Sequence, residues 1–155
     1  MSPAHRRPLR AAVLLVTAVS ASAALAGCTS YTGSPAHQVV EWASTADVAS
    51  NDQLVVQDVA AIRRSVKENK LKYLTSNCAG LVYDAGTAYG NLPTPDNTLT
   101  NELNVAYEDF VSAGSSCAAA HVLHSARIAA ALEKISAGAA ALAKATERLS
   151  GDGVH

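Results

Sequence analysis

The chain has 155 residues, a length that suits one domain. Its 12 basic and 13 acidic residues nearly balance, but three of the arginines lie before residue 11. The remainder therefore carries 9 basic residues against 13 acidic ones. This mildly acidic balance argues against nucleic acid as a partner and against electrostatic docking on anionic lipid.

The first 28 residues have the parts of an export signal in the expected order. A positive start is followed by an apolar run at residues 11–25, which is too short and too rich in Ala and Ser for a membrane span. The run leads into the sequence Leu-Ala-Gly-Cys at residues 25–28. This stretch resembles the lipobox of bacterial lipoproteins.

The resemblance implies cleavage between Gly27 and Cys28 and a diacylglyceryl thioether on the Cys28 sulfur. The mature protein would then sit on the extracytoplasmic face of the cell membrane, with the membrane as a partner through its acyl chains. Each buried CH₂ contributes ~0.8 kcal/mol, so two or more chains make a stable anchor. One alternative is an ordinary secretory signal in which Cys28 is incidental. Another is twin-arginine export, but Arg6 and Arg7 match that signal only in part, and Sec export fits better.

These features divide the chain into four parts. We expect residues 1–27 to be the cleaved signal peptide, 28–35 a lipidated tether, 36–151 a helical bundle domain and 152–155 a tail. The tether consists of uncharged loop formers. A flexible chain of this length sets the domain about 15 Å from the anchor.

Two helices are expected at the start of the domain. Pro35 behind a Ser34 cap begins a short first helix, and its Trp42 is expected in the core rather than at an interface. Capping residue types at 50–53 predict that the second helix starts near Asp52. Apolar residues of the second helix then recur every three or four positions: Val55, Val59, Ile62 and Val66.

The third and fourth helices show heptad spacing on either side of a proline-rich loop at residues 91–96. The seam of the third helix is Leu71, Leu74, Cys78, Leu81, Ala85 and Ala88. The seam of the fourth is Leu99, Leu103, Ala106, Phe110, Ala113, Cys117 and Ala120.

With Cys28 assigned to lipid, Cys78 and Cys117 are the remaining pair in a compartment where disulfides persist. Each lies on the seam of its own helix, so a bridge between two antiparallel helices agrees with both hydrophobic patterns. Along the sequence, the midpoint between the two cysteines falls after the centre of the loop. In an antiparallel pair joined by that loop, the fourth helix should therefore extend past the end of the third. Two buried free thiols or a metal site are the alternatives.

A fifth helix is expected from about Ser125 to a stop at Gly151. Its apolar stripe is Ile128, Leu132, Ile135, Ala139, Leu142 and Leu149. Small residues dominate this helix, so its neighbours should approach closely. The sequence therefore predicts an all-α fold, an antiparallel four-helix bundle with a short additional N-terminal helix and one inter-helix disulfide.

Residues with catalytic or metal-binding chemistry do not form a recognisable motif. His121 and His124 have a spacing that can hold a metal, but they lack an HExxH frame, so we expect a helix-end role and no metal. The carboxylates of Glu41, Glu108 and Asp109 fit a solvated face. We therefore expect no cofactor and no enzymatic activity.

A second resemblance covers most of the mature chain. The short helix with Trp42, the Cys78-x-x-Leu81 step, the proline-rich loop and Cys117 in an Ala-rich helix look like small lipoproteins of actinobacteria that carry no assigned function. This family implies a helical fold and the disulfide, and no activity.

Three functions agree with these features. The favoured one is a non-catalytic envelope lipoprotein whose bundle contacts another protein or the cell wall. The second is a bundle that holds a small apolar or metal-containing ligand in a cavity lined by Tyr83, Tyr89 or Phe110. The third is an enzyme with an unrecognised site.

Overall fold

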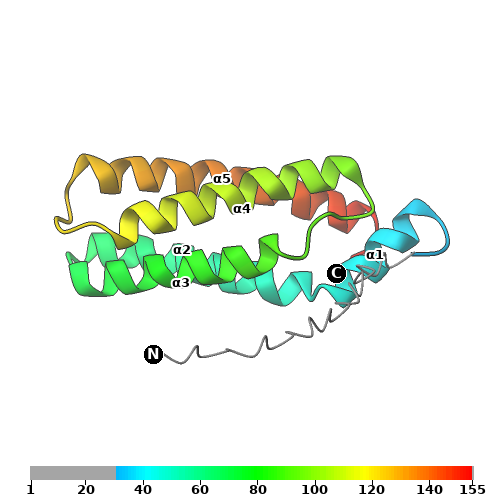
Figure 1. The fold of residues 1–155 in the computed structure, drawn as a ribbon, viewed down its shortest axis with the longest axis horizontal. Helices are drawn as coiled ribbons and strands as arrows, with labels where there is room; N and C mark the ends of the chain where they lie inside the picture. The colour runs from blue at the N-terminus through cyan, green and yellow to red at the C-terminus, as the bar shows by residue number, and fades with distance from the viewer. Residues whose placement is uncertain (1–30, 155) are drawn as a thin grey trace, which may run out of the picture.

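The computed structural model describes residues 31–154, and the regular elements in that range are all helices (Figure 1). Gly27 and Cys28 lie outside the described residues. None of the helices within the described part has both the length and the hydropathy of a membrane span. The elements are α1 (Pro35–Thr45), α2 (Val48–Lys67), α3 (Leu71–Tyr89), α4 (Asn97–Ala118) and α5 (Ala126–Gly151).

The four long helices form the predicted antiparallel bundle, with α2 and α3 in one layer and α4 and α5 in the other (Figure 1). Close packing joins α2 to α3, α3 to α4 and α4 to α5. By contrast, α2 and α5 make almost no close backbone contact, although they are neighbours in the bundle. The bundle is therefore tight along three of its seams and open along the fourth.

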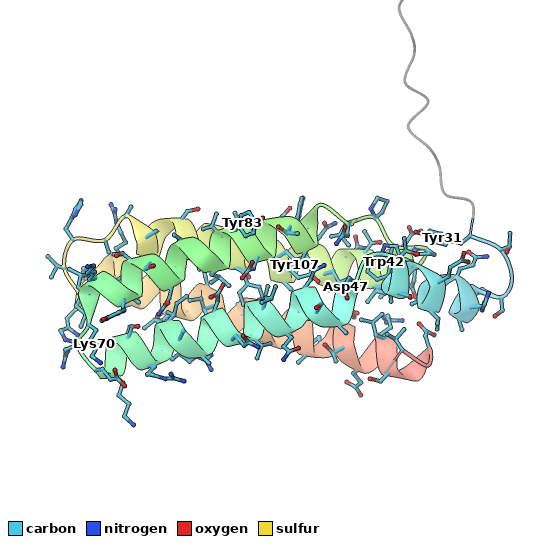
Figure 2. The ribbon with its side chains drawn as sticks, turned by 90° about the horizontal axis from the view of Figure 1, so that it is seen from below. Tyr31, Trp42, Asp47, Lys70, Tyr83 and Tyr107 are labelled. Atoms are coloured by element: carbon cyan, nitrogen blue, oxygen red, sulfur yellow. A yellow bond between two sulfur atoms is a disulfide. The ribbon has the colours of Figure 1, made fainter. Side chains whose placement is uncertain are left out.

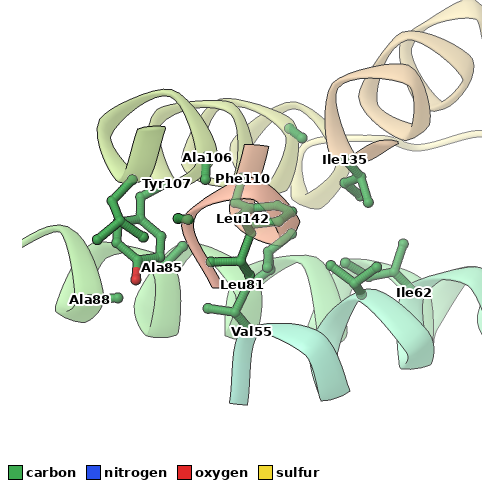
Figure 3. Packing of buried hydrophobic residues seen from close by; sticks show 14 of the residues in the cluster. Val55, Ile62, Leu81, Ala85, Ala88, Ala106, Tyr107, Phe110, Ile135 and Leu142 are labelled. Carbon is green, nitrogen blue, oxygen red and sulfur yellow. The ribbon is translucent and has the colours of Figure 1, made fainter. Parts of the chain in front are cut away.

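The core contains the side chains that the heptad spacing placed inside it. Figure 3 shows Val55, Leu81, Phe110 and Leu142 gathered between the helices. The fully buried large side chains are Phe110, Ile62, Leu74, Leu81, Leu99, Leu103, Ile135, Val55, Cys78 and Cys117. Nearly all lie on the predicted seams, so the hydrophobic spacing identified the inner face of each helix.

The short α1 closes one end of the bundle, next to the C-terminus (Figure 1). As expected, the side-chain oxygen of Ser34 caps α1 by accepting a hydrogen bond from the His37 N–H, and Pro35 occupies the first position of the helix. Trp42 is buried, as predicted, and its Nε1 donates to the carbonyl of Asn91 at 3.1 Å. This bond fixes α1 to the loop between α3 and α4.

The predicted start of the second helix near Asp52 is wrong, because α2 begins at Val48. The polar residues of its first turns do not cap a helix: one bonds locally and the other bonds across the bundle. Asn51 Nδ2 donates to the carbonyl of Ala46, and Asp52 accepts a hydrogen bond from Tyr107 in α4. Val48 is 5% exposed, so the additional turn also buries apolar surface. Tertiary contacts therefore override the capping preference of these residue types.

Cys78 and Cys117 form the predicted disulfide, with Cα atoms 5.7 Å apart. Cys78 lies 11 residues before the end of α3, whereas Cys117 lies 20 residues after the start of α4. At 1.5 Å per residue, α4 extends about 13 Å beyond α3. Figure 1 shows the loop between α3 and α4 running along this extension, as predicted from the positions of the two cysteines.

The loop between α3 and α4 is held by its own side chains. The hydroxyl of Thr94 is buried, donates to the Asp96 carbonyl at 2.6 Å and lies 3.0 Å from the hydroxyl of Thr100. Asp96 then caps α4 by accepting from the backbone N–H groups of Thr98 and Leu99. The Leu92–Pro93 peptide bond is cis.

The chain beyond α5 folds back onto the bundle as far as it is described. The Val154 N–H donates to the carbonyl of Leu149 at 3.0 Å, and the Val154 side chain packs against the core. Residues 152–154 thus form a helix cap rather than a freely extended segment.

Two glycines allow the close packing of α4 with its neighbours. A β-carbon on Gly114 would lie 2.8 Å from the Cys78 carbonyl oxygen in α3. One on Gly138 of α5 would lie 3.0 Å from the Ala106 carbonyl oxygen in α4. Gly86, by contrast, has no neighbouring atom within 4 Å of such a carbon.

We expect Gly114→Ala to lower the free energy of unfolding by about 1–3 kcal/mol, because the methyl group forces α3 and α4 apart. Gly138→Ala should destabilise less, since its contacts are longer. Gly86→Ala is the matched control and should stabilise the protein by about 0.5–1 kcal/mol through helix propensity. Urea denaturation of the three variants measures these differences. Equal stability of Gly114→Ala and Gly86→Ala would contradict the close approach of α3 and α4.

Candidate functional site

The two histidines considered as metal ligands lie in the loop between α4 and α5, and both are exposed. His124 Nε2 is 2.9 Å from Asn69 Oδ1, in the turn between α2 and α3. This contact ties together two turns at the end of the bundle opposite α1. Within residues 31–154, no group of three or more His, Cys, Asp or Glu side chains is placed to hold a metal ion.

The carboxylates singled out from the sequence lie toward solvent. Glu41 and Glu108 are exposed. Glu108 accepts a hydrogen bond from Tyr89 at 3.2 Å, which raises the pKa of the Tyr89 hydroxyl. Asp109 is 3.9 Å from the Lys134 ammonium group. These contacts describe a surface network between helices rather than a catalytic cleft.

The aromatic residues expected around an internal cavity do not share one. Tyr83 is 75% exposed on α3. Tyr89 borders a shallow hollow of about 310 Å³ that Val111 and Ser112 also line. Phe110 is buried and reaches a different hollow, on the side of α2 and α5. Among the described residues, Tyr89 and Phe110 thus border two separate surface hollows, and Tyr83 lies toward solvent.

The open seam between α2 and α5 forms an apolar groove. Its larger section has a volume of about 410 Å³. This section is lined by Val48, Ala49, Asp52, Gln53, Val56, Leu142, Thr146, Leu149, Ser150 and Val154. A second section of about 260 Å³ shares Val56, Leu142 and Thr146 with the first and continues to Phe110 and Arg63. The two sections form one trough, here called the α2–α5 groove.

Asp52 is the ionisable residue of the larger section. Its Oδ1 accepts a hydrogen bond of 2.7 Å from the hydroxyl of Tyr107, which extends from α4 (Figure 2). Burial raises the pKa of Asp52 to about 6, although the bond from Tyr107 acts in the opposite direction. Burial and the Asp52 carboxylate raise the pKa of Tyr107 above its ordinary value. Tyr107 therefore remains a hydrogen-bond donor to this carboxyl group.

A second acidic residue with a raised pKa lies on the opposite side of α2, against α3. Burial and the neighbouring Asp84 carboxylate raise the pKa of Asp58 to about 6. Its Oδ2 is buried and has no hydrogen-bond partner within the described residues. Gly80 on α3 faces this carboxyl group, and its missing side chain provides the space that Asp58 occupies.

Sequence reasoning missed the α2–α5 groove and the role of Asp52. Asp is a residue type that favours helix starts, and this preference hides the place of Asp52 on a helix face. Val56 lies off the stripe of Val55 and Val59, and it is 57% exposed. An apolar residue beside the main stripe was the one available signal that α2 has a second apolar flank.

The chain matches no protein-family model, no curated protein and no solved structure. The groove and its residues are therefore interpreted from their own geometry and chemistry.

Asp58 provides a test of the acidic pair. The pKa of the Asp58 carboxyl group is higher in the folded protein than in the unfolded chain. Its contribution to the free energy of unfolding is therefore fully present below about pH 4 and is lost as the pH rises through about 6. We expect Asp58→Asn to be more stable than the wild type at pH 7.5, with the difference shrinking at pH 4.5.

Urea denaturation at the two pH values measures this effect. Glu41→Gln, at an exposed position, is the control and should follow the wild type at both pH values. A wild-type protein that equals or exceeds Asp58→Asn in stability at pH 7.5 would contradict the raised pKa of Asp58.

Proposed function

We propose that this protein is a lipid-anchored module on the extracytoplasmic face of the cell membrane that acts by binding rather than by catalysis. Its partner is another envelope protein or the cell wall, and its binding surface is the α2–α5 groove. The observation that carries the proposal is the open apolar seam of an otherwise closely packed bundle. Exposed apolar grooves of this kind mark interaction sites in proteins.

The position of the anchor supports this proposal. Tyr31, the first described residue, is partly buried against the bundle core, three residues after Cys28. At 3.3–3.6 Å per residue, Cys28 can lie no more than about 10 Å from Tyr31. Acyl chains on Cys28 would therefore hold the α1 end of the bundle close to the membrane surface.

The distribution of acidic groups supports binding rather than acid–base chemistry. The two carboxyl groups with strongly raised pKa values, Asp52 and Asp58, lie on opposite flanks of α2. Asp52 contacts Tyr107, and Asp58 contacts Asp84. General acid–base catalysis requires such groups to converge on one reacting centre.

The anchor is tested with Cys28→Ala. Because acylation is the proposed attachment to the membrane, we expect this variant to accumulate as an uncleaved precursor or to be released as soluble protein. Fractionation of cells followed by immunoblotting measures both outcomes, and Cys78→Ser is the control, since it removes the disulfide but not the anchor. Mature Cys28→Ala protein that stays in washed membranes would contradict the proposed lipid anchor on Cys28.

The groove is tested by photo-crosslinking in living cells. A photoreactive phenylalanine at Val56 or Ala143 places the probe on the two walls of the groove. Tyr73 is the control because it is 62% exposed, close to the 57% of Val56, but lies on α3. We expect a discrete protein or cell-wall adduct from Val56 and Ala143, and little from Tyr73. Equal adducts from all three positions, or none from the groove, would contradict the assignment.

A further inference from the structure

The larger section of the α2–α5 groove combines apolar walls with a single carboxyl group. Val48, Val56, Leu142 and Leu149 supply most of the wall, and Asp52 is the ionisable residue among the groups that line it. Tyr107 engages Oδ1 of this carboxyl group, so an acceptor oxygen remains for a ligand. A volume of about 410 Å³ is within the range of small-molecule sites.

The other polar groups of this section also favour a ligand that donates hydrogen bonds. The Thr146 hydroxyl donates to the Leu142 carbonyl at 2.9 Å, and the Ser150 hydroxyl donates to the Thr146 carbonyl at 2.9 Å. Both hydroxyl hydrogens are thus used within α5, and the oxygens are left as acceptors. Apart from the Gln53 amide, which can both donate and accept, this section therefore presents acceptors and one acidic group to its contents.

We propose that the α2–α5 groove binds a hydrophobic primary ammonium, with the ammonium group on the Asp52 carboxylate and the hydrocarbon between Val56 and Leu142. This inference rests on the groove being the binding surface proposed above. A charge-assisted hydrogen bond in a partly buried site is stronger than a neutral one, and the apolar walls contribute through burial of the hydrocarbon.

Arg63 fixes the direction in which the ligand lies. The second section of the groove continues past Val59 and Phe110 to Arg63. Its guanidinium group repels an ammonium group, whereas its apolar neighbours accept a hydrocarbon chain. The ammonium group therefore belongs at Asp52, and the hydrocarbon extends toward Phe110.

The groups around Asp52 give the binding a definite pH dependence. Tyr107 from α4 is the titratable group that contacts it, and the α5 residues that line this section carry no ionisable side chain. Gln53 is its polar neighbour on α2. Because the pKa of Asp52 is raised to about 6, affinity for an ammonium ligand should fall as the pH drops below that value.

Isothermal titration calorimetry with three probes of equal chain length tests the proposal. The mature acylated protein in lipid nanodiscs is titrated at pH 7.5 with n-hexylammonium, n-hexanol and hexanoate, and empty nanodiscs give the blank. We expect hexylammonium to bind roughly tenfold or more tightly than hexanol, because of the charge-assisted bond, and hexanoate to bind least. Binding of hexylammonium should weaken at pH 5.

Two variants separate the carboxyl group from the groove. Asp52→Asn keeps the size of the side chain and should reduce hexylammonium binding to the level of hexanol, with hexanol unchanged. Ala49→Phe fills the groove from an exposed position and should weaken hexylammonium and hexanol together. Glu41→Gln is the control, because it removes an exposed carboxylate outside the groove, and it should bind as the wild type does. Circular dichroism confirms that each variant is folded.

Three results would overturn the proposal: hexanol or hexanoate binding as tightly as hexylammonium, hexylammonium binding unchanged in Asp52→Asn, or no binding of any probe. Crosslinking from Val56 and Ala143 remains a separate readout. If it persists without ammonium binding, the groove is an interaction surface for a macromolecule and the ammonium ligand is wrong. If neither is seen, the groove has no binding role.

Discussion

The close approach of α4 to both of its neighbours determines the shape of this bundle. Gly114 brings α4 against the backbone of α3 at Cys78, and the Cys78–Cys117 disulfide holds the two helices together at the same level. Gly138 brings α5 against α4 at Ala106. These contacts leave little depth for side chains between α3 and α4 at Gly114 and between α4 and α5 at Gly138.

Two aromatic side chains of α4 are buried on the side of the bundle where α2 lies. Tyr107 reaches Asp52 on α2, and Phe110 lines the groove beside Val59. Close packing around α4 thus occurs together with little close backbone contact between α2 and α5. The groove lies along that looser seam.

Heptad spacing was sufficient to predict the helices, their inner faces and the extension of α4 beyond α3, because each depends on periodicity along the chain. The disulfide also needed the assignment of Cys28 to lipid, which left Cys78 and Cys117 as the remaining pair. It was insufficient where residues far apart in sequence decide the outcome. The start of α2 was misplaced because Asp52 bonds to Tyr107, 55 residues away. The groove was missed for a similar reason. It depends on the distance between α2 and α5, which the periodicity of a single helix does not give, and Val56 beside the main stripe of α2 is its one trace in the sequence.

The proposed anchor and the proposed ligand are physically compatible. The section of the groove that holds Asp52 begins at Val48 and Val154, at the α1 end of the bundle (Figures 1 and 2). Cys28 precedes Tyr31 by three residues, so the proposed acylation would bring this end of the groove near the headgroup layer. Amphiphilic amines concentrate in that layer, with the hydrocarbon in the bilayer and the ammonium group at its surface. A ligand entering the groove there exchanges one apolar environment for another, and the Asp52 carboxylate supplies the interaction that distinguishes an ammonium from other lipid-like molecules.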